Sequence, residues 1–387
     1  MMFFIWMLLP LIVILLAGIY LCRKVYGAVC FFGENLTKKM RIMIAAGVTG
    51  ILILSVALIN GLWFVIFMHM VVFLLVLDFI ALIVKKLRKN KTFPYWGKAV
   101  YRSGIPALLA AVLLVGYGYY NIHHIVKTEY TVWTDKEIRE EGYTIVFFSD
   151  LHYGTAANSG QLKQAMDAIE GENPDIVILG GDIVDERTSL AQMQEAFEIM
   201  GNIHTRYGIY YVYGNHDKSE YTQRPNYTAA QLADAIEQAG IRILEDETCE
   251  INGEILLIGR ADRGHGAGTR KSVFQLVEGA DAAKEWILID HQPVEYADVM
   301  ESGCGLILSG HTHAGQVWPL GFLAEVFHTD EMTYGYRQAG SLTEVVSSGI
   351  AGWGYPVRTE KHSEYVVIHL MKPLRDASSN NFGWISG

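Results

Sequence analysis

Charged residues are scarce in this sequence, and cysteine is scarcer still. Charged residues make up 19% of the 387 residues, below the roughly 25% usual for soluble domains. Four cysteines in the whole chain exclude a disulfide-rich scaffold. A chain with 51% hydrophobic and 12% aromatic residues is not intrinsically disordered either. The composition instead indicates a membrane part joined to a soluble part.

Acidic residues are nearly absent from the first third of the chain. Residues 1–129 contain 13 Lys and Arg but only three acidic residues, Glu34, Asp78 and Glu129. The remainder contains 18 Lys and Arg against 38 Asp and Glu, so it forms a strongly acidic domain. This charge argues against nonspecific nucleic-acid binding, and no nucleic-acid partner is expected. It still permits a phosphate-containing substrate where metal ions supply positive charge.

Four long apolar runs account for the low charge of the N-terminal part. They cover residues 3–22, 42–59, 62–84 and 105–120, and the last continues uncharged to residue 126. Each run reaches or approaches the about 20 residues that a helix needs to cross a bilayer. The first run lacks the basic segment that opens a cleavable signal peptide, so we expect it to be retained. We therefore predict a membrane domain with four transmembrane helices at 1–126, a linker and lead-in strand at 127–142, and a soluble domain at 143–387.

Basic residues are concentrated in two of the three connections between these runs. Five lie within residues 23–41 and seven within residues 85–102, whereas Asn60 and Gly61 carry no charge. Because basic loops stay in the cytoplasm, both termini and the acidic domain are predicted on the extracytoplasmic side of the cell membrane.

Two ionisable residues, His69 and Asp78, lie within the third run. Such residues in a membrane span are functional candidates. They are nine residues apart, however, and therefore face opposite sides of a helix. We favour structural packing or interhelical hydrogen bonding over a functional role.

From about residue 130, strand and helix patterns alternate. We predict strands at 143–149, 175–180 and 208–213, with helices at 160–170, 189–201 and 229–239. Further strands are predicted at 241–244, 254–258, 286–290, 305–309, 344–347 and 365–370. Early alternation followed by strand-rich sequence favours two sheets covered by helices, a four-layer α/β/β/α sandwich.

Polar motifs directly follow five of these strands, where open α/β folds bind ligands. Each motif alone is compatible with an ordinary turn or helix cap. Their occurrence together, each after an apolar strand, indicates one metal site. The motifs are Asp150-Leu151-His152, Gly181-Asp182-Ile183-Val184-Asp185, Gly214-Asn215-His216-Asp217, His291 and Gly310-His311-Thr312-His313.

The ligand types in these motifs are too many for one ion. Without His216 and Asp217, they comprise three carboxylates, four imidazoles and one amide. Mixed imidazole and carboxylate ligands suit Mn, Fe, Zn or Co better than Ca or Mg. We therefore expect two divalent ions that share an anionic bridge, with Mn favoured.

This order of motifs closely resembles the calcineurin-like metallophosphoesterase superfamily, over about residues 144–370. Within it, the sequence looks most like a bacterial membrane-anchored branch. That branch has Ala/Gly-Gly-Gln after the Gly-His-Thr-His motif, here residues 314–316. It also has a late Ser-x-Gly segment that runs into Pro-Val/Ile-Arg, here residues 348–358.

The resemblance implies a role for each matched residue. Asp182 would bridge the two ions, and Asp185 would support the ligands from outside. His216 would stabilise charge on the phosphate or protonate the leaving group, with Asp217 orienting His216. The ligands of the first ion would be Asp150, His152, Asp182 and His313. Those of the second would be Asp182, Asn215, His291 and His311.

Two ions roughly 3.5–4 Å apart would bring the pKa of a bridging water near neutrality. The hydroxide so formed would attack phosphorus, so we expect direct transfer to water with inversion. The sequence thus predicts a membrane-anchored hydrolase acting on a phosphate monoester, diester or pyrophosphate. Its phosphoester substrate could be a lipid or an envelope precursor, because the four spans would hold the enzyme among membrane lipids.

Two other interpretations stay open. One is a membrane sensor or partner-binding protein with a non-catalytic domain of this kind, and the intact ligand set argues against it. The other is a transporter-like module with a regulatory hydrolase, which the few polar residues in the spans disfavour.

Aromatic residues late in the chain could contact a membrane, but we expect them to pack in the core. They are Trp318, Phe322, Phe327, Trp353 and Tyr355.

Overall fold

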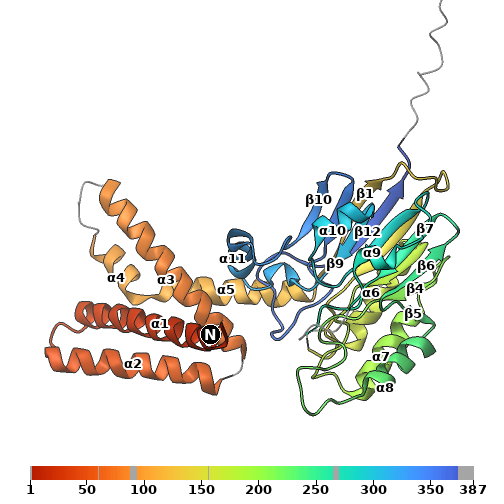
Figure 1. The fold of residues 1–387 in the computed structure, drawn as a ribbon. Helices are drawn as coiled ribbons and strands as arrows, with labels where there is room; N and C mark the ends of the chain where they lie inside the picture. Colours follow the sequence, from red (N-terminus) through yellow and green to blue (C-terminus); the bar gives the residue numbers. More distant parts are fainter. Residues whose placement is uncertain (1, 60, 88–93, 156, 265–269, 374–387) are drawn as a thin grey trace, which may run out of the picture. The chain divides into compact units, whose positions relative to one another are not determined.

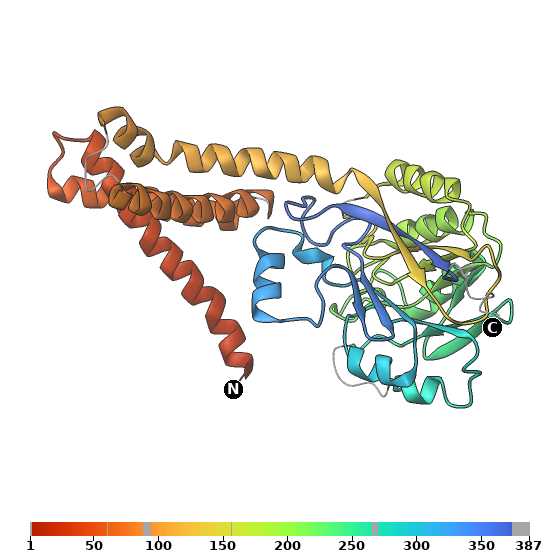
Figure 2. The same ribbon diagram turned by 90° about the horizontal axis from the view of Figure 1, so that it is seen from above.

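The computed structural model describes residues 2–59, 61–87, 94–155, 157–264 and 270–373, with side chains from Ile14 onward except that of Ala57. The chain forms two compact units, Met1–Gly118 (unit 1) and Tyr119–Gly387 (unit 2). Both appear in Figures 1 and 2, and each is described by itself.

Unit 1 is helical. Its helices are α1 (Met2–Phe32), α2 (Lys38–Leu58), α3 (Gly61–Leu87), α4 (Tyr95–Ser103) and α5 (Ile105–Ile122), the last of which continues into unit 2. Among the described residues, four helices are long and apolar enough to cross a membrane, namely α1, α2, α3 and α5. These are the four predicted spans. The short helix α4 was not predicted, because its nine residues mix basic and aromatic side chains.

The first helix is longer than the sequence pattern indicated. It continues to Phe32, so Arg23 and Lys24 lie on a helix and not in a connecting loop. The prediction was wrong because it ended the helix at the first charged residue. No proline interrupts this stretch to end the helix there. The Lys24 ammonium also has a partner, since its Nζ lies 2.5 Å from Asp78 Oδ1.

Asp78 joins three helices of unit 1. Its carboxylate accepts hydrogen bonds from the Tyr20 hydroxyl at 2.9 Å, from the Lys24 ammonium and from the Tyr101 hydroxyl. His69 has a separate environment, with Nδ1 2.8 Å from the Val65 carbonyl oxygen and a side chain that is buried. These contacts support the structural role that the sequence favoured for Asp78.

Replacing Asp78 with alanine should destabilise the full-length protein in detergent by about 1–3 kcal/mol, because Lys24 loses a charge-assisted hydrogen bond. Thermal unfolding measures this loss. A Lys24→Ala/Asp78→Ala double variant should lose less than the two single variants together, since it leaves no unpaired charge. An unchanged unfolding temperature for Asp78→Ala would show that this cluster does not hold the helices together.

Unit 2 is built on two six-stranded sheets. In spatial order the first contains β1 (Ile125–Trp133), β12 (Ser363–Met371), β2 (Tyr143–Phe148), β3 (Ile176–Leu179), β4 (Ile209–Tyr211) and β5 (Ile241–Ile243). The second contains β10 (Gly335–Ala339), β11 (Leu342–Val346), β9 (Leu306–Ser309), β8 (Glu285–Ile289), β7 (Ile255–Gly259) and β6 (Glu247–Ile251). In the first sheet β2 to β5 are parallel, and so are β11, β9, β8 and β7 in the second.

Helices cover the outer faces of both sheets (Figure 1). The first sheet carries α6 (Ser159–Gly171), α7 (Leu190–Gly201) and α8 (Ala229–Gln238), and the second carries α9 (Val273–Leu276) and α10 (Tyr296–Ser302). One apolar cluster lies between the sheets, with Phe147 and Ile178 from the first and Ile287 and Leu308 from the second. This arrangement is the predicted four-layer sandwich.

The helices and strands at the centre of the fold were predicted because their sequence patterns are the clearest. The run in β2 is buried on both faces, as expected for a strand inside a covered sheet. Helices α6, α7 and α8 each begin with a capping box, in which a side chain of the N-cap and one three residues later satisfy each other's backbone N–H groups. The edge strands β6 and β10 were not predicted, because several of their residues are exposed and the apolar pattern is weak.

Candidate metal centre

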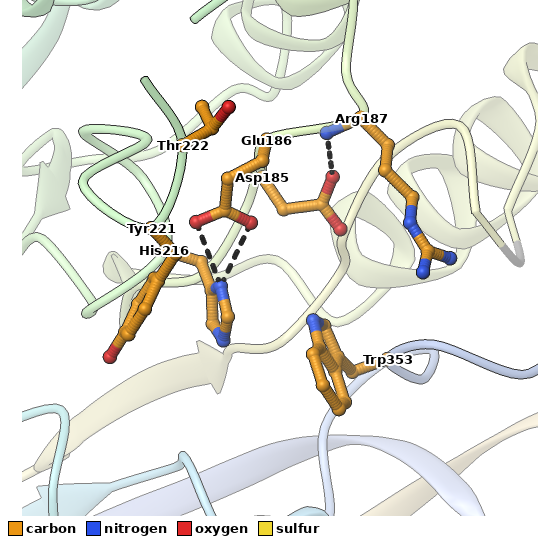
Figure 3. A pocket seen from close by; sticks show the side chains of 7 residues that line it. All are labelled: Asp185, Glu186, Arg187, His216, Tyr221, Thr222 and Trp353. Atoms are coloured by element: carbon orange, nitrogen blue, oxygen red, sulfur yellow. Dashed lines mark hydrogen bonds and ion pairs between the residues drawn. The ribbon is translucent and has the colours of Figure 1, made fainter. Parts of the chain in front are cut away.

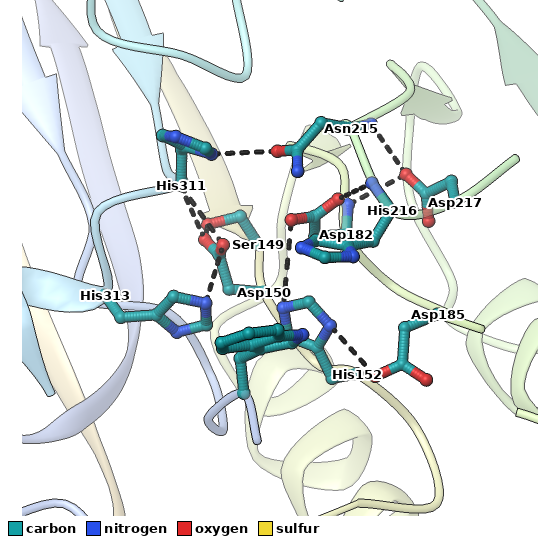
Figure 4. Close-up of polar contacts among 12 residues, drawn as sticks. Ser149, Asp150, His152, Asp182, Asp185, Asn215, His216, Asp217, His311 and His313 are labelled. Atoms are coloured by element: carbon teal, nitrogen blue, oxygen red, sulfur yellow. Dashed lines mark hydrogen bonds and ion pairs between the residues drawn. The ribbon is translucent and has the colours of Figure 1, made fainter. Parts of the chain in front are cut away.

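The predicted ligand loops meet at the carboxyl ends of β2, β3 and β4 in one sheet and of β8 and β9 in the other (Figure 4). Asn215 Oδ1 lies 2.8 Å from His311 Nδ1 and so joins the loop after β4 to the loop after β9. The other six predicted ligands form two groups whose ligand atoms lie within 4.8 Å of one another. The groups are Asp150, His152 and His313, and Asp182, His291 and His311.

Asp182 lies between the two groups. Its Oδ2 is 3.1 Å from His291 Nε2 and 3.7 Å from His152 Nε2, so one carboxylate oxygen lies near a ligand of each group. Its Oδ1 accepts a hydrogen bond from the His216 backbone N–H at 2.8 Å. The side chain is almost completely buried. This position suits a carboxylate that bridges two ions.

The backbone at these ligands is unusual. Five of them adopt a positive φ, which is sterically unfavourable for residues other than glycine. Such strain is common at functional sites, where the surrounding structure enforces it. Close packing adds a further constraint, since a Cβ at Gly310 would collide with the Ser149 hydroxyl and the Asp150 carboxylate. The five are Asp150 (56°), His152 (42°), Asp182 (54°), His311 (68°) and His313 (51°).

The donor set fits divalent ions. Among the described residues, Nδ1 of His313 is buried without a hydrogen-bond partner, and Nε2 of His152 and Nε2 of His291 face Asp182 Oδ2 at 3.7 and 3.1 Å without a well-formed hydrogen bond. His291 Nδ1 lies 2.7 Å from the Gly180 carbonyl oxygen, which fixes its tautomer and leaves a lone pair on Nε2. Buried carboxylates beside unpaired imidazole nitrogens are costly unless a cation joins them. Such a set matches Mn, Fe, Zn or Co.

Electrostatics in the site favour the metal-binding forms of Asp182, His311 and His313, whereas contact with a carboxylate favours the protonated form of His291. Burial opposes charge on both Asp182 and His291, but their mutual contact outweighs it. The pKa of Asp182 therefore lies well below its ordinary value, and the pKa of His291 well above. Burial lowers the pKa of His313 to about 3 and lowers the pKa of His311 as well, so both imidazoles are neutral ligands near pH 7.

Two residues outside the ligand set hold the ligands in place. Asp185 Oδ2 lies 3.3 Å from His152 Nδ1, and Asp185 Oδ1 accepts the Arg187 backbone N–H at 2.8 Å. Arg358 is completely buried and donates from Nη1 to the His313 carbonyl oxygen at 2.7 Å. The Pro-Val-Arg segment noted in the sequence thus ends on a side chain that fixes the backbone of a predicted ligand.

Asp217 occupies a different place from the one predicted. Its buried carboxylate accepts four backbone N–H groups, and no hydrogen bond joins it to the ring of His216, although the structure describes both residues. It thereby ties the loop after β3 to the loop after β4. The prediction that Asp217 orients the His216 ring was wrong because the carboxylate is used by these N–H groups. They belong to Asp182, Ile183, Val184 and Gly214.

Glu186 is the partner of His216. Its two carboxylate oxygens lie 3.0 and 3.1 Å from His216 Nδ1. Burial lowers the pKa of His216, but Glu186 and Asp182 outweigh burial and raise it above the ordinary value. Glu186 directly follows the Gly-Asp-x-x-Asp motif, and no spacing rule in the sequence pointed to it.

A pocket of about 410 Å³ opens beside His216 (Figure 3). The ring centroid of His216 lies 4.8 Å from that of Tyr221 and 5.4 Å from that of Trp353, so two aromatic rings flank the imidazole. Gln316 holds Trp353 by accepting its backbone N–H at 2.9 Å. The pocket offers room for a leaving group next to His216. It is lined by Asp185, Glu186, Arg187, His216, Tyr221, Thr222 and Trp353.

Comparison with known proteins gives the class. Residues 143–315 match the family of calcineurin-like phosphoesterases. An uncharacterized metallophosphoesterase of Helicobacter pylori strain J99 is 29% identical over 243 residues, covering 61% of this chain and 60% of that protein. One from Aquifex aeolicus is 28% identical over 276 residues, covering 68% and 98%. A Danio rerio transmembrane protein with metallophosphoesterase domain is 28% identical over 296 residues, covering 70% and 63%.

The family match includes all the predicted ligand loops. This chain therefore contains a domain that is similar to the calcineurin-like phosphoesterases, and it also contains four helices long and apolar enough to cross a membrane. The chain spans about 60% of the length of the Helicobacter pylori relative.

Replacing Glu186 with glutamine should lower kcat by about tenfold with little change in KM, because His216 loses an ionic partner that contributes part of its acid–base effect. The loss should be larger for an alkyl phosphate ester than for a 4-nitrophenyl ester, whose leaving group needs no proton. Steady-state kinetics on both esters measure it, with Glu237→Gln on the exposed face of α8 as the matched control. Equal losses on both esters would contradict a role through His216.

Proposed function

We propose that this protein is a membrane-anchored, dinuclear-metal phosphoesterase that hydrolyses a phosphate ester or pyrophosphate. The observation that carries the proposal is the convergence of seven predicted ligand side chains, Asp182 among them, six of which are labelled in Figure 4. The match to calcineurin-like phosphoesterases over these loops supports it.

The ligand groups indicate how two ions would be held. Asp182 would contact both ions, and Mn²⁺ is the first ion to test. When bound, such ions acidify a water molecule and neutralise charge on the phosphate. One ion would be held by Asp150, His152, Asp182 and His313, and the other by Asp182, Asn215, His291 and His311.

The chain's own residues supply the remaining chemistry. His216 would donate a proton from Nε2 to the leaving oxygen, since Glu186 engages its Nδ1. The Asp217 carboxylate holds the two loops that present Asp182 and His216. The side chains of Tyr221 and Trp353 would contact the leaving group in the pocket. No side-chain nucleophile is required.

We further propose that the domain faces the extracytoplasmic side and acts on a lipid or envelope precursor. The basic connections of unit 1 support this orientation. The four spans support the substrate class, because they keep the domain beside lipids. The acidic charge of unit 2 gives no reason to expect a nucleic-acid substrate. A reporter that works only in the cytoplasm, fused to the C terminus, should be inactive. An active reporter would refute this topology.

Hydrolysis of 4-nitrophenyl phosphate and bis(4-nitrophenyl) phosphate by the full-length protein with Mn²⁺ tests the activity. Asp182→Asn serves as the blank. We expect turnover of at least one ester well above the blank. Preference for the diester would indicate phosphodiester lipids or cyclic nucleotides, and preference for the monoester lipid phosphates or phosphosugars. Metal-loaded protein that hydrolyses neither ester nor a lipid pyrophosphate would contradict the proposal and favour a sensor.

A further inference from the structure

The helix α11 (Leu320–Phe327) presents apolar side chains on the surface of unit 2. Phe327 is 71% exposed, Phe322 55% and Val326 52%, and Gly321 is the only buried residue of its eight. Figure 1 shows α11 at the periphery of unit 2, apart from both sheets. The expectation that Phe322 and Phe327 pack in the core was wrong, because the chain between β9 and β10 leaves the sheet to form this helix. A cluster of exposed apolar side chains of this kind marks a contact surface.

Side-chain hydrogen bonds fix this helix in place. The Glu360 carboxylate accepts the backbone N–H groups of Gly321 at 2.9 Å and Phe322 at 3.1 Å, which satisfies two of the donors exposed at the start of a helix. The Thr359 hydroxyl accepts the Trp318 backbone N–H at 2.9 Å. Residues 359–360 therefore set the direction in which the apolar side chains project.

The same segment holds the end of the last membrane span. Asn121 and Ile122 close helix α5 and belong to unit 2. Asn121 Nδ2 donates to the carbonyl oxygens of Arg358 at 2.9 Å and Lys361 at 2.6 Å, and the Ser363 hydroxyl donates to the Ile122 carbonyl oxygen at 3.1 Å. Residues 358–363 thus connect the end of a span to the start of α11, and all these contacts lie within unit 2.

The loop that precedes α11 also carries a predicted ligand. His313 opens a short 3₁₀ helix, η1 (His313–Gly315), and Gln316 follows it. Gly315 approaches Gly321 so closely that a Cβ on Gly315 would collide with the backbone there. The start of α11 therefore packs directly against the short helix that begins at His313.

We infer that the exposed apolar side chains of α11 insert into the interfacial layer of the bilayer beside the end of α5. The occupant of this surface is lipid, because residues 358–363 bond both the end of a membrane span at Asn121 and Ile122 and the start of α11, and the exposed side chains of α11 are apolar apart from Glu325. Phenylalanine and leucine side chains bind this layer by burying apolar area. This part of the inference rests on the proposed function. The contact would place the metal centre at the membrane surface, so its substrates are phosphoesters embedded in the membrane.

Photo-crosslinking identifies what covers α11. Benzoylphenylalanine is placed at Phe327 of the full-length protein in vesicles of phosphatidylethanolamine and phosphatidylglycerol. The matched control is Phe274 on α9, which is 44% exposed. We expect lipid adducts at Phe327 at least tenfold more abundant than at Phe274. Adducts to a second copy or to other residues of this chain, or lipid adducts no more abundant than at Phe274, would overturn the inference.

A second experiment tests the consequence for substrate. Phe322→Glu/Phe327→Glu changes exposed side chains and should leave hydrolysis of soluble methyl 4-nitrophenyl phosphate unchanged. Hydrolysis of a diacylglycerol 4-nitrophenyl phosphodiester in vesicles, which has the same leaving group, should fall at least tenfold. Equal activity of variant and parent on the vesicle substrate would overturn the assignment of membrane-embedded substrates. If the parent protein hydrolyses neither diester, the assignment of membrane-embedded phosphodiesters fails, the 4-nitrophenyl phosphate and lipid pyrophosphate assays decide the proposed function, and the crosslinking result decides the membrane contact.

Discussion

Replacing Asp182 with asparagine should lower kcat by about 10³-fold or more on any phosphoester that the protein hydrolyses. Paired metal ions supply several kcal/mol of transition-state stabilisation, and about 1.4 kcal/mol corresponds to a tenfold change in rate. Asp182 is the residue whose loss affects both ligand groups, because its Oδ2 lies 3.1 Å from His291 Nε2 and 3.7 Å from His152 Nε2.

Metal content and turnover are measured together for this variant. Elemental analysis should find fewer ions per chain in Asp182→Asn than in the parent protein. Asp234→Asn, on the exposed surface of α8, is the matched control and should keep both metal and activity. An Asp182→Asn protein with full activity would refute the bridging assignment. Unchanged circular dichroism would show that the loss does not come from unfolding.

Replacing His216 with asparagine should lower kcat by about 10²–10³-fold on alkyl phosphate esters, the range typical of a lost general acid. The ring lies in the pocket beside Tyr221 and Trp353, and Glu186 holds its Nδ1. Activity on 4-nitrophenyl esters should fall much less, because that leaving group departs without protonation. Metal content should stay at the parental value, since His216 is outside both ligand groups.

The dependence of kcat on the pKa of the leaving group distinguishes proton donation by His216 from stabilisation of charge on the phosphate by His216. A series of aryl and alkyl esters should give a steeper dependence for His216→Asn than for the parent protein. His204→Asn, at an exposed histidine three residues after the end of α7, is the matched control. A uniform loss across the series would show that His216 stabilises charge on the phosphate and does not protonate the leaving group.

The positions of the ligand loops could be predicted because two independent signals coincide. Apolar runs such as the one in β2 identify strands that are buried on both faces. Polar motifs then follow directly at the carboxyl ends, where such folds bind ligands. Neither signal depends on long-range contacts, so Asp150, His152 and Asp182 could be assigned from the sequence to one site.

The partner of His216 and the role of α11 could not be predicted. Asp217 and Glu186 are both acidic and both close to motif residues, and only the folded chain shows which carboxylate faces the imidazole. Phe322 and Phe327 resemble core residues in the sequence. Their exposure follows from the path of the chain after His313, which local patterns do not determine.

We propose that unit 2 holds a dinuclear metal centre that hydrolyses phosphoesters. Calorimetric titration of Mn²⁺ into metal-free full-length protein in detergent, with hydrolysis of bis(4-nitrophenyl) phosphate or 4-nitrophenyl phosphate followed in parallel, tests it most directly. We expect two ions per chain and turnover that appears only as the second ion binds. Binding of a single ion at saturation, or full turnover in the presence of a chelator, would contradict it.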